Sequence, residues 1–497
     1  MKSQQELETW LSGKKNVIRE AHRPPLAVDL DGTITTVDTF HEGLLSVVKR
    51  MDIRSVISIM GQMSDGRAAL KRRIATKSDF DPSLLPYNES FLTYLRAEKA
   101  HGRQLGLFTA ADQSIADSVG DHLGIFDVVR GSDGTINLSG ARKLAVIREE
   151  FGDHFAYAGD SMVDAPLFAA ASFSVLVGPR VSRLERIVGP SSVIDMRFPT
   201  PKLGLRVWTK ALRLPHWAKN LLVFIAPALG FGMLDAMIVL QAMLLYVAMG
   251  LLASATYLLN DLLDLPADRA HPFKRNRPIA AGLIPAKTAV SMGLGLGLAA
   301  LAIALNLPWA TLLSLLGYLL ITLAYSFALK RIAIIDVFML AGLFSLRVYA
   351  GSTLLPSPAT PWLLTFSMLF FLGLAMIKRY AELDRVVSSG GAGVISRGYI
   401  SKDLPLLLAA GVSSGFGAIA ILMMYLMAEQ YPSGQYARPG LLWGLIPVIL
   451  IWTLRVWHRA VHGRMNEDPL MFAMHDRFSI NLAVLSVLIM FFAWLPA

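Results

Sequence analysis

The 497-residue sequence contains no cysteine, and only 17% of its residues are Asp, Glu, Lys or Arg. Without cysteine the chain can form no disulfide and can use no thiolate as a nucleophile or metal ligand. The first 24 residues are polar and lack the apolar core of a signal peptide. The low charge, together with 54% hydrophobic residues and a mean hydropathy of +0.48, excludes an ordinary soluble protein and indicates a membrane protein.

The apolar residues are unevenly distributed, which predicts two domains joined by a linker. Residues 1–200 have a normal globular mixture, residues 201–216 form a basic, aromatic segment typical of an amphipathic interfacial helix, and residues 217–497 consist of long apolar runs. The net charge of +10 favours contact with anionic lipid surfaces or phosphorylated substrates over nucleic acid, because the basic residues gather at the ends of the apolar runs.

Nine apolar runs are long enough to cross a hydrocarbon core of about 30 Å. They lie at 217–234, 236–260, 285–305, 308–328, 333–352, 361–380, 404–427, 441–457 and 478–496. Positive charge is concentrated in alternate loops, so the positive-inside rule predicts a protein of the cell (inner) membrane whose N-terminal domain and charged loops are cytoplasmic and whose C-terminus is on the opposite side.

The segment from Asn260 to Pro278 is the strongest candidate site in the membrane half. It holds three carboxylates spaced three and four residues apart, which a helix would place on one face: Asp261, Asp264 and Asp268. Because like charges repel, a hard cation such as Mg²⁺, bridging to a substrate phosphate, is the expected partner. Basic side chains follow that suit the phosphate oxygens left uncovered: Arg269, His271, Lys274, Arg275 and Arg277.

A second candidate site lies in the N-terminal half, where polar residues follow buried strands. The apolar run 25–28 leads into Asp29-Leu-Asp31-Gly-Thr, a second predicted strand ends at Thr109, and a third ends at Gly-Asp160-Ser-Met-Val-Asp164. The first two carboxylates allow one to attack a phosphorus and the other to handle the leaving-group proton. The last two suit Mg²⁺, and Lys143, in a predicted helix, suits the charge on a phosphoryl group.

Further polar residues lie in or at the ends of the predicted spans, where burying a charge is costly. Arg347 is predicted to face a cavity and contact phosphate. The run Lys378-Arg379-Tyr380-Ala-Glu382 ends the sixth span with both signs of charge and is a second candidate metal-and-phosphate site, while Tyr325 and Lys330 end the fourth.

The N-terminal half resembles the haloacid dehalogenase superfamily. Four motifs occur in family order, namely Asp29-x-Asp31-Gly-Thr, the strand ending at Thr109, Lys143, and Gly-Asp160-x-x-x-Asp164. The resemblance implies a Rossmann-like α/β phosphatase domain with a helical cap at about 40–90. It further implies that Asp29 is the nucleophile, Asp31 the general acid and base, and Asp160, with Asp164 in support, the ligand of Mg²⁺.

The membrane half resembles the UbiA superfamily of intramembrane prenyltransferases, over roughly residues 210–497. The resemblance rests on Asn260-Asp261-x-x-Asp264-x-x-x-Asp268-Arg269, the basic run up to Arg277, the segment 325–330 and the predicted nine-helix bundle. It implies that the aspartates and Mg²⁺ bind a pyrophosphate, while an isoprenoid chain lies in a lateral opening to the lipid.

The chain lacks a second motif that many UbiA members carry, and this difference indicates which branch of the superfamily it resembles. Members that prenylate aromatic acceptors carry a second aspartate-rich motif after the sixth span, where this chain has Lys378-Arg379-Tyr380-Ala-Glu382. With Arg213-x-x-x-Trp217-x-Lys219-Asn220 and Arg347-x-x-Ala-Gly, the chain looks like the branch of polyprenyl-phosphate phosphoribosyltransferases. That branch implies transfer of 5-phosphoribose from phosphoribosyl pyrophosphate to a polyprenyl (decaprenyl) phosphate. It also implies a set of substrate-binding residues in the membrane half: Lys219, Asn220, Asn260, Tyr325, Lys330, Arg347, Lys378, Arg379 and Tyr380.

The sequence leaves two other functions open. One is prenyl transfer from a polyprenyl pyrophosphate to an aromatic or other small acceptor, and the other is a lipid-phosphate carrier or scaffold without turnover. If the membrane domain transfers 5-phosphoribose, the fused phosphatase domain is expected to remove the 5-phosphate of the transferase product. Mg²⁺ in both domains, the bilayer and a polyprenyl lipid are the expected cofactor and partners, and the oligomeric state is not predicted.

Overall fold

The computed structural model describes residues 23–49, 66–188, 192–200, 203–229, 235–356, 360–391, 393–394, 397–433, 436–465 and 468–495. The chain divides into two compact units. One consists of Met1–Ala211 and Asp261–Val290, and the other of Leu212–Asn260 and Ser291–Ala497. The segment with the three aspartates therefore groups with the N-terminal unit, whereas the sequence-based division assigned it to the membrane domain.

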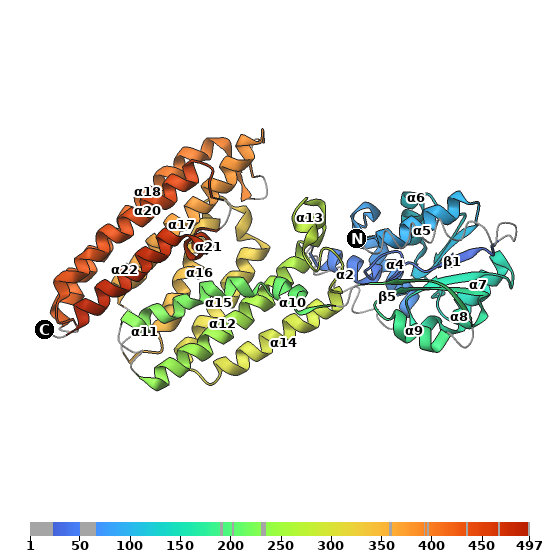
Figure 1. The fold of residues 1–497 in the computed structure, drawn as a ribbon, viewed down its shortest axis with the longest axis horizontal. Coiled ribbons are helices and arrows are strands. Elements are labelled where there is room, and N and C mark those ends of the chain that lie inside the picture. Colours follow the sequence, from blue (N-terminus) through green and yellow to red (C-terminus); the bar gives the residue numbers. More distant parts are fainter. Residues whose placement is uncertain are drawn as a thin grey trace. The chain divides into compact units, whose positions relative to one another are not determined.

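A six-stranded sheet lies at the centre of the first unit, and all its neighbouring strands are parallel (Figure 1). The strand order is β3-β2-β1-β4-β5-β6. The strands are β1 (Leu26–Val28), β2 (Leu105–Asp112), β3 (Val128–Ser132), β4 (Ala156–Gly159), β5 (Phe173–Gly178) and β6 (Val193–Pro199). The structure confirms the predicted α/β region with a parallel sheet, and three of its strands overlap the three predicted ones. The predicted end of the second strand at Thr109 is wrong, because β2 continues to Asp112.

Both faces of this sheet are covered, which explains why its central strands are apolar at every position. In β1, Leu26 and Val28 join one hydrophobic core and Ala27 joins the other, because successive side chains point to opposite faces. The first core is completed by α5 (Glu89–Ala100) and α6 (Gln113–Leu123). The second is completed by α7 (Ala141–Phe151), α8 (Ala165–Ala170) and α9 (Val181–Val188).

The region where a helical cap was predicted contains two described helices. They are α2 (Thr39–Lys49) and α4 (Arg67–Lys77), and they share a small core formed by Val47 and Ile74. Residues 50–65 of the predicted cap lie outside the described residues. The first unit also contains α10 (Leu205–Ala211), within the predicted interfacial linker, and α13 (Leu265–Ala270).

The second unit is helical, and eight helices in the described parts of the chain are long and apolar enough to cross a membrane. Their main elements are α12 (Ala236–Leu263), α14 (Ala286–Ala304), α15 (Trp309–Phe327), α16 (Ile335–Ser352), α17 (Pro361–Ser388), α18 (Leu404–Tyr425), α20 (Leu445–Val461) and α22 (Arg477–Trp494). Shorter elements are α19 (Tyr431–Ser433), α21 (Pro469–His475) and the hairpin of β7 (Gly393–Val394) and β8 (Tyr399–Ile400). These helices fit a helical membrane domain.

The prediction of nine spans differs from this count at the first span, 217–234. There the described residues form a 3₁₀ helix, η4 (Leu214–Phe224), followed by the short α11 (Ile225–Leu229), and residues 230–234 lie outside the described part. Pro215 stands in the first turn of η4 and Pro227 inside α11, and each removes a backbone donor that a continuous α-helix would use.

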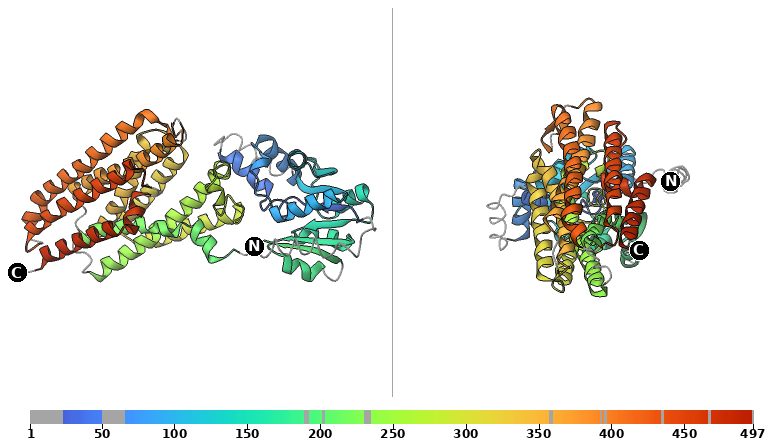
Figure 2. Two further views of the ribbon diagram at one scale, coloured as in Figure 1. Left: turned by 45° about the horizontal axis from the view of Figure 1, so that its top comes forward. Right: turned by 90° about the vertical axis from the view of Figure 1, so that its left-hand side faces the viewer.

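The helices α17, α18 and α20 pack against one another in the second unit (Figure 2). Glycine permits part of this close approach, since a Cβ built on Gly411 of α18 would lie 2.3 Å from the Trp457 ring and 2.8 Å from Met376 Cβ. The same core includes Trp457, Met376 and Ile377, so α17 is fixed along its length. This rigid packing positions the polar residues that α17 carries near the end that is predicted to face the cytoplasm.

Candidate functional sites

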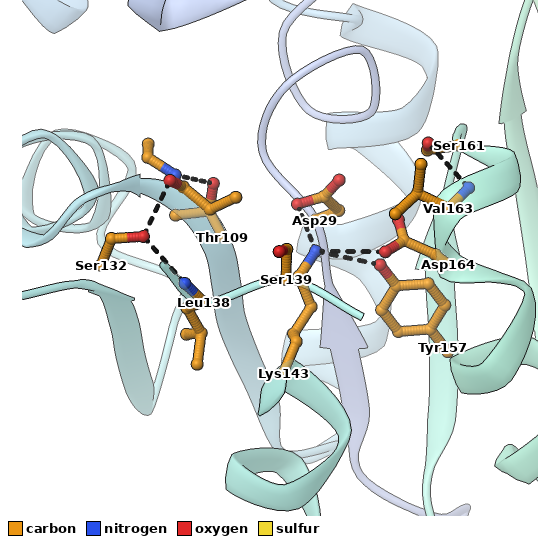
Figure 3. A network of polar contacts seen from close by, with 12 residues as sticks. Asp29, Thr109, Ser132, Leu138, Ser139, Lys143, Tyr157, Ser161, Val163 and Asp164 are labelled. Atoms are coloured by element: carbon orange, nitrogen blue, oxygen red, sulfur yellow. Dashed lines mark hydrogen bonds and ion pairs between the residues drawn. The ribbon is translucent and has the colours of Figure 1, made fainter. Parts of the chain in front are cut away.

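Asp29 and Lys143 form the centre of the site in the α/β unit (Figure 3). Asp29 follows β1, and the Lys143 Nζ lies 2.9 Å from Asp29 Oδ1, 3.7 Å from Asp164 Oδ1 and 3.3 Å from the Tyr157 hydroxyl. Burial lowers the pKa of the Lys143 ammonium, but Asp29 and Asp164 outweigh burial and raise it above its ordinary value. The lysine is therefore a permanent cation beside the predicted nucleophile.

Asp160 lies against the turn that follows Asp29. A Cβ on Gly32, whose φ is +76°, would fall 2.4 Å from Asp160 Oδ2, so only glycine allows this approach. Burial, and then the charges of Asp29 and Asp164, raise the pKa of Asp160 to about 7. The structure thus brings the first, third and fourth predicted motifs to one edge of the sheet.

Asp31 is oriented by the start of α2, because its Oδ1 accepts a 2.8 Å hydrogen bond from the Thr39 amide. Burial and the nearby Asp38 carboxylate raise the pKa of Asp31 to about 7, which suits a group that gives and takes a proton near neutrality. Thr109 is fully buried, and its hydroxyl accepts a hydrogen bond from the Ala111 amide at 3.0 Å.

The carboxylates of this site fit a divalent cation of the magnesium type. Burial, and then Asp29, raise the pKa values of Asp160 and Asp164, although Lys143 partly offsets the effect at Asp164, so a bound cation would stabilise both ionised carboxylates. Among the described residues no three His, Cys, Asp or Glu side chains form a metal cluster by themselves. Magnesium needs no such cluster, because it commonly uses one or two carboxylates with substrate phosphate and water.

The three aspartates of the 260–278 segment do not lie on one continuous helix as predicted. Asp261 is in the last turn of α12, Asp264 stands between the helices as the N-cap residue of α13, and Asp268 lies within α13. Pro266, in the first turn of α13, has no amide hydrogen to continue the ladder of α12, which accounts for the break.

Two of these aspartates still meet through a cation. Arg277 Nη1 lies 2.5 Å from Asp268 Oδ2 and 3.2 Å from Asp261 Oδ1, and both carboxylates are nearly inaccessible, at 2% and 4% residue exposure. The pair is a hard-oxygen donor set that fits Mg²⁺ with a substrate phosphate. Arg277, predicted to hold phosphate, contacts the aspartates in this structure, whereas the predicted phosphate ligands Lys274 and Arg275 are exposed.

Arg269, predicted as a phosphate ligand, forms an ion pair with a carboxylate in this structure. Its two terminal nitrogens each donate a 2.9 Å hydrogen bond to the carboxylate of Glu42 in α2, and its Nε donates to the Ala280 carbonyl at 3.0 Å. Both side chains are largely buried, at 8% and 12% exposure. The sequence could not suggest this partner, because Glu42 and Arg269 are 227 positions apart.

Replacing Arg269 with methionine is expected to destabilise the α/β unit by about 3 kcal/mol, because it leaves the buried Glu42 carboxylate without its cation. The measurement is the thermal unfolding midpoint of the detergent-purified protein. The double variant E42Q/R269M should regain part of the loss, since neither partner is then charged. An unchanged midpoint with a raised KM for the pyrophosphate substrate would instead make Arg269 a phosphate ligand.

The second unit contains a cavity of about 580 Å³ with a basic lining. Five of the predicted site residues line it: Lys219, Asn260, Tyr325, Arg347 and Lys378. It also contains basic residues absent from the predicted site: Arg213, His216, Arg397 and His475. Burial, Lys219 and Arg213 lower the pKa of His216 to about 4, so this ring is neutral at physiological pH. The positive charge of the cavity therefore comes from its lysine and arginine side chains, which suit an anionic group.

Arg347 lines this cavity as predicted, but several of its donors are used by the protein. Its guanidinium bonds to the Asn220 side chain at 3.0 Å, to the Tyr318 hydroxyl at 2.8 Å and to the Leu343 carbonyl at 2.6 Å. Asn220, also a predicted substrate ligand, is 1% exposed and contacts Arg347 instead of lining the cavity. These contacts fix the plane of the guanidinium at the cavity wall.

In the predicted metal-and-phosphate site at the end of α17, Arg379 and Glu382 form ion pairs within the protein, while Lys378 lines the basic cavity. Arg379 contacts Asp336 and Glu382, and it donates a 3.2 Å hydrogen bond to the Tyr325 hydroxyl. Glu382 is one turn along the helix from Arg379, so the two side chains neutralise each other. Tyr380 packs edge-on against Trp457 in the core, and neither Tyr380 nor Lys330 is part of the cavity lining.

Asp468 is the principal residue that the sequence did not reveal. It is the only acidic side chain among the described residues that line the basic cavity, and it pairs with Lys219 and Lys378. The run Asp468-Pro469-Leu470 carries a helix-start signal, which the structure bears out as the N-cap of α21. Its ion pairs could not be predicted, because they join residues 249 and 90 positions apart.

A second, apolar cavity of about 280 Å³ lies in the same unit. It is lined by side chains of α11, α17, α18, α20 and α22, among them Ile225, Phe366, Phe370 and Met490. Leu470 of α21 lines both this cavity and the basic one. A basic cavity and an apolar cavity that share a lining residue suit a ligand with an anionic head and an apolar tail.

The chain is similar in sequence to several known proteins. The chain is 37% identical to the uncharacterized protein y4nM of Sinorhizobium fredii over 455 residues, 92% of this chain and 88% of that protein. It is 39% identical over 187 residues to the decaprenyl-phosphate phosphoribosyltransferase of Mycobacterium tuberculosis, which covers 37% of this chain and 62% of that enzyme.

Solved structures and a family profile complete the comparison. A UbiA homolog from Archaeoglobus fulgidus bound to GPP and Mg²⁺ aligns with a TM-score of 0.44 at 16% identity, covering 58% of this chain and 98% of that one. The profile of the UbiA prenyltransferase family matches residues 221–483, more than half of the sequence. The chain therefore belongs to the UbiA prenyltransferase family.

Proposed function

We propose that the UbiA-family region, residues 221–483, transfers 5-phosphoribose from phosphoribosyl pyrophosphate to a polyprenyl phosphate, and that the site around Asp29 and Lys143 removes the 5-phosphate from the product. The observation that carries the transferase proposal is the pair of cavities that meet at Leu470, one basic and one apolar. The 39% identity to a decaprenyl-phosphate phosphoribosyltransferase supports the same choice of substrates.

Transfer requires that charge be stabilised on the leaving pyrophosphate and on the attacking lipid phosphate. The C1–O bond to pyrophosphate breaks with its electron pair left on the pyrophosphate, and an oxygen of the lipid phosphate forms the new bond to C1. In our proposal Asp261 and Asp268, with Asp264 nearby in the chain, would hold Mg²⁺, which would supply positive charge for the leaving pyrophosphate. Arg277, which contacts both carboxylates, is the cation of this segment that lies ready for phosphate oxygens.

The basic cavity supplies further groups for the phosphates. Asn260, the residue before Asp261 in α12, lines this cavity together with Lys378 and Arg347. Their side chains suit the phosphates of the donor and acceptor, because cationic donors are strongest in water-poor surroundings. The apolar cavity, which shares Leu470 with the basic one, has no Asp, Glu, Lys or Arg among the described residues of its lining, so it suits part of a polyprenyl chain.

The α/β unit has the groups that hydrolysis of a phosphate monoester needs. Asp29 attacks the phosphorus and forms an aspartyl-phosphate, while Asp31 gives its proton to the departing ribose oxygen. Water then releases phosphate, with Asp31 as the base. Lys143 balances the charge of the phosphoryl group, and Asp160 with Asp164 holds Mg²⁺. Fusion of the two activities raises the effective concentration of the second substrate.

The cell (inner) membrane, with the α/β unit and the charged loops on the cytoplasmic side, is the location that we propose. It is supported by eight apolar helices in the described chain and by the concentration of basic residues in alternate loops. Both substrates of the transferase then present their phosphates on one side of the bilayer.

The mass of the lipid product tests the proposed function directly. Purified protein is incubated with Mg²⁺, polyprenyl phosphate and isotope-labelled phosphoribosyl pyrophosphate, and the lipids are analysed by mass spectrometry. We expect a lipid-linked phosphoribose first and a lipid-linked ribose, lighter by one phosphate, later. Chelation of divalent ions should stop both steps.

Two outcomes would replace the proposal by one of its alternatives. Consumption of a polyprenyl pyrophosphate with a small aromatic acceptor, and no labelled lipid, would identify a prenyltransferase. Binding of the lipid phosphate without conversion of any donor, in protein that is folded by its thermal unfolding, would identify a carrier or scaffold.

A further inference from the structure

Lys219, Asp468 and Lys378 form a compact charged group in the basic cavity, here called the lysine–aspartate cluster. Asp468 Oδ2 lies 2.9 Å from Lys219 Nζ and 3.2 Å from Lys378 Nζ, while Asp468 Oδ1 accepts a 3.2 Å hydrogen bond from the Leu470 amide. The three residues come from η4, the start of α21 and α17, so the cluster exists only in the folded unit.

The cluster keeps unused capacity for an anion. Two lysines share one carboxylate, which leaves a net charge of about +1, and each ammonium has three donors of which Asp468 takes one. Lys219 is 11% exposed and Asp468 14%, so the group is shielded from bulk water, whereas Lys378, at 38%, is accessible. An anion that enters can therefore bind both ammonium groups at once.

The position of the lysine–aspartate cluster indicates which of the two substrates it binds. Leu470, whose amide holds Asp468, is a residue that lines both the basic and the apolar cavity. A lipid whose chain occupies the apolar cavity has its head group at this junction, next to Lys219 and Lys378. The free pyrophosphate donor has no apolar part and gains nothing from the junction. The location thus favours the lipid head over the donor.

We propose that Lys219 and Lys378, held together and oriented by Asp468, bind the phosphate head of the polyprenyl acceptor. The assignment rests on the proposed function in taking a polyprenyl phosphate as substrate. Arg213 and Arg397, which also line the basic cavity, are not part of this assignment.

Asp468 acts in this site as a positioning residue. Burial raises the pKa of its carboxyl, but Lys378 and Lys219 outweigh burial and hold that pKa well below the usual range, so the group stays ionised. Without the carboxylate the two ammonium groups repel and turn away from each other. A phosphate then meets lysines that no longer converge, even though their charges are unchanged.

Equilibrium binding of a tritiated polyprenyl phosphate, with no donor present, tests the proposal in protein reconstituted in lipid nanodiscs. K219M and K378M are each expected to raise the Kd about tenfold or more, the usual effect of losing a hydrogen bond between charged groups. D468N should raise it several-fold, and D468E should restore part of the affinity. The matched control is K402M, because Lys402 is exposed and does not line the cavity.

Three further measurements separate recognition of the phosphate head from a loss of folding and from binding of the donor. Polyprenol, which has the same chain and no phosphate, should bind the wild type and all variants equally, which shows that each variant is folded. Inorganic phosphate should compete only weakly, because it lacks the chain. In turnover assays the variants should raise the KM for the polyprenyl phosphate and leave the KM for phosphoribosyl pyrophosphate unchanged.

The proposal is overturned if K219M and K378M bind the polyprenyl phosphate as the wild type does, or if they raise the KM of the donor instead. Equal or tighter binding by D468N would overturn the positioning role. Failure of the proposed function looks different, since the lysine variants would still lose affinity for the lipid phosphate although no phosphoribose is transferred by any protein.

Discussion

Replacing Asp261 with asparagine is expected to lower the rate of lipid-linked product formation at least about 100-fold, the effect of losing a metal-binding carboxylate. Asp261 is 4% exposed and shares Arg277 with Asp268. Asparagine keeps the shape but removes the charge that a divalent cation requires. The measurement is kcat/KM for the pyrophosphate donor over a range of Mg²⁺ concentrations, and the Mg²⁺ concentration for half-maximal rate should rise.

The control for this variant lies at the other end of the same helix. Asp235 precedes α12, and its side chain accepts a hydrogen bond from the Met237 amide, which asparagine can also accept. D235N should therefore transfer as the wild type does. Hydrolysis of a small aryl phosphate by the α/β unit should be similar in D261N and the wild type. Wild-type transfer by D261N, with unchanged Mg²⁺ dependence, would remove the aspartate segment from the active site.

The α/β unit could be predicted well because its signals are local. Short apolar runs that end in Asp29 or Asp160 are typical of buried strands of a parallel sheet, and the sheet then brings the strand ends together. The structure adds what the spacing could not supply, namely that Lys143 lies between Asp29 and Asp164 and that Gly32 touches Asp160. Three-dimensional proximity of the motifs follows from topology, while the ion pairs depend on side-chain directions.

The membrane unit could be predicted only in part because its important contacts are distant in sequence. The apolar runs identified the long helices, but a run of hydrophobic residues does not distinguish the 3₁₀ helix η4 from an α-helix. Among the charged residues, Arg379 was expected to bind phosphate and pairs with Asp336, and Asp468 was not singled out. A sequence reveals which charges are costly to bury, and only the fold reveals which opposite charge lies beside each one.

Replacing Asp29 with asparagine is expected to abolish phosphate-ester hydrolysis, with a loss of about 10³-fold or more, because it removes the side chain that we propose attacks phosphorus. The amide oxygen of asparagine can still accept the hydrogen bond from Lys143, and Asp164 remains near its ammonium, so the buried lysine keeps partners and the fold should persist. Hydrolysis of an aryl phosphate and trapping of an acyl-phosphate with hydroxylamine measure the loss. D153N is the matched control, because Asp153 is an exposed aspartate whose ion pair is with the exposed Arg148.

The same variant separates the two steps that we assign to the protein. With donor and lipid phosphate supplied, D29N should accumulate the lipid-linked phosphoribose that still carries its 5-phosphate, while D261N should accumulate neither product. A mixture of D29N and D261N proteins should restore the lipid-linked ribose, but more slowly than the wild type at equal concentration, because the intermediate must then pass between molecules. If D29N instead forms the dephosphorylated lipid as fast as the wild type, the α/β unit acts on another substrate. The order in which the two lipids accumulate therefore decides whether the α/β unit acts on the product of the transferase. The structure of either site alone does not answer this question.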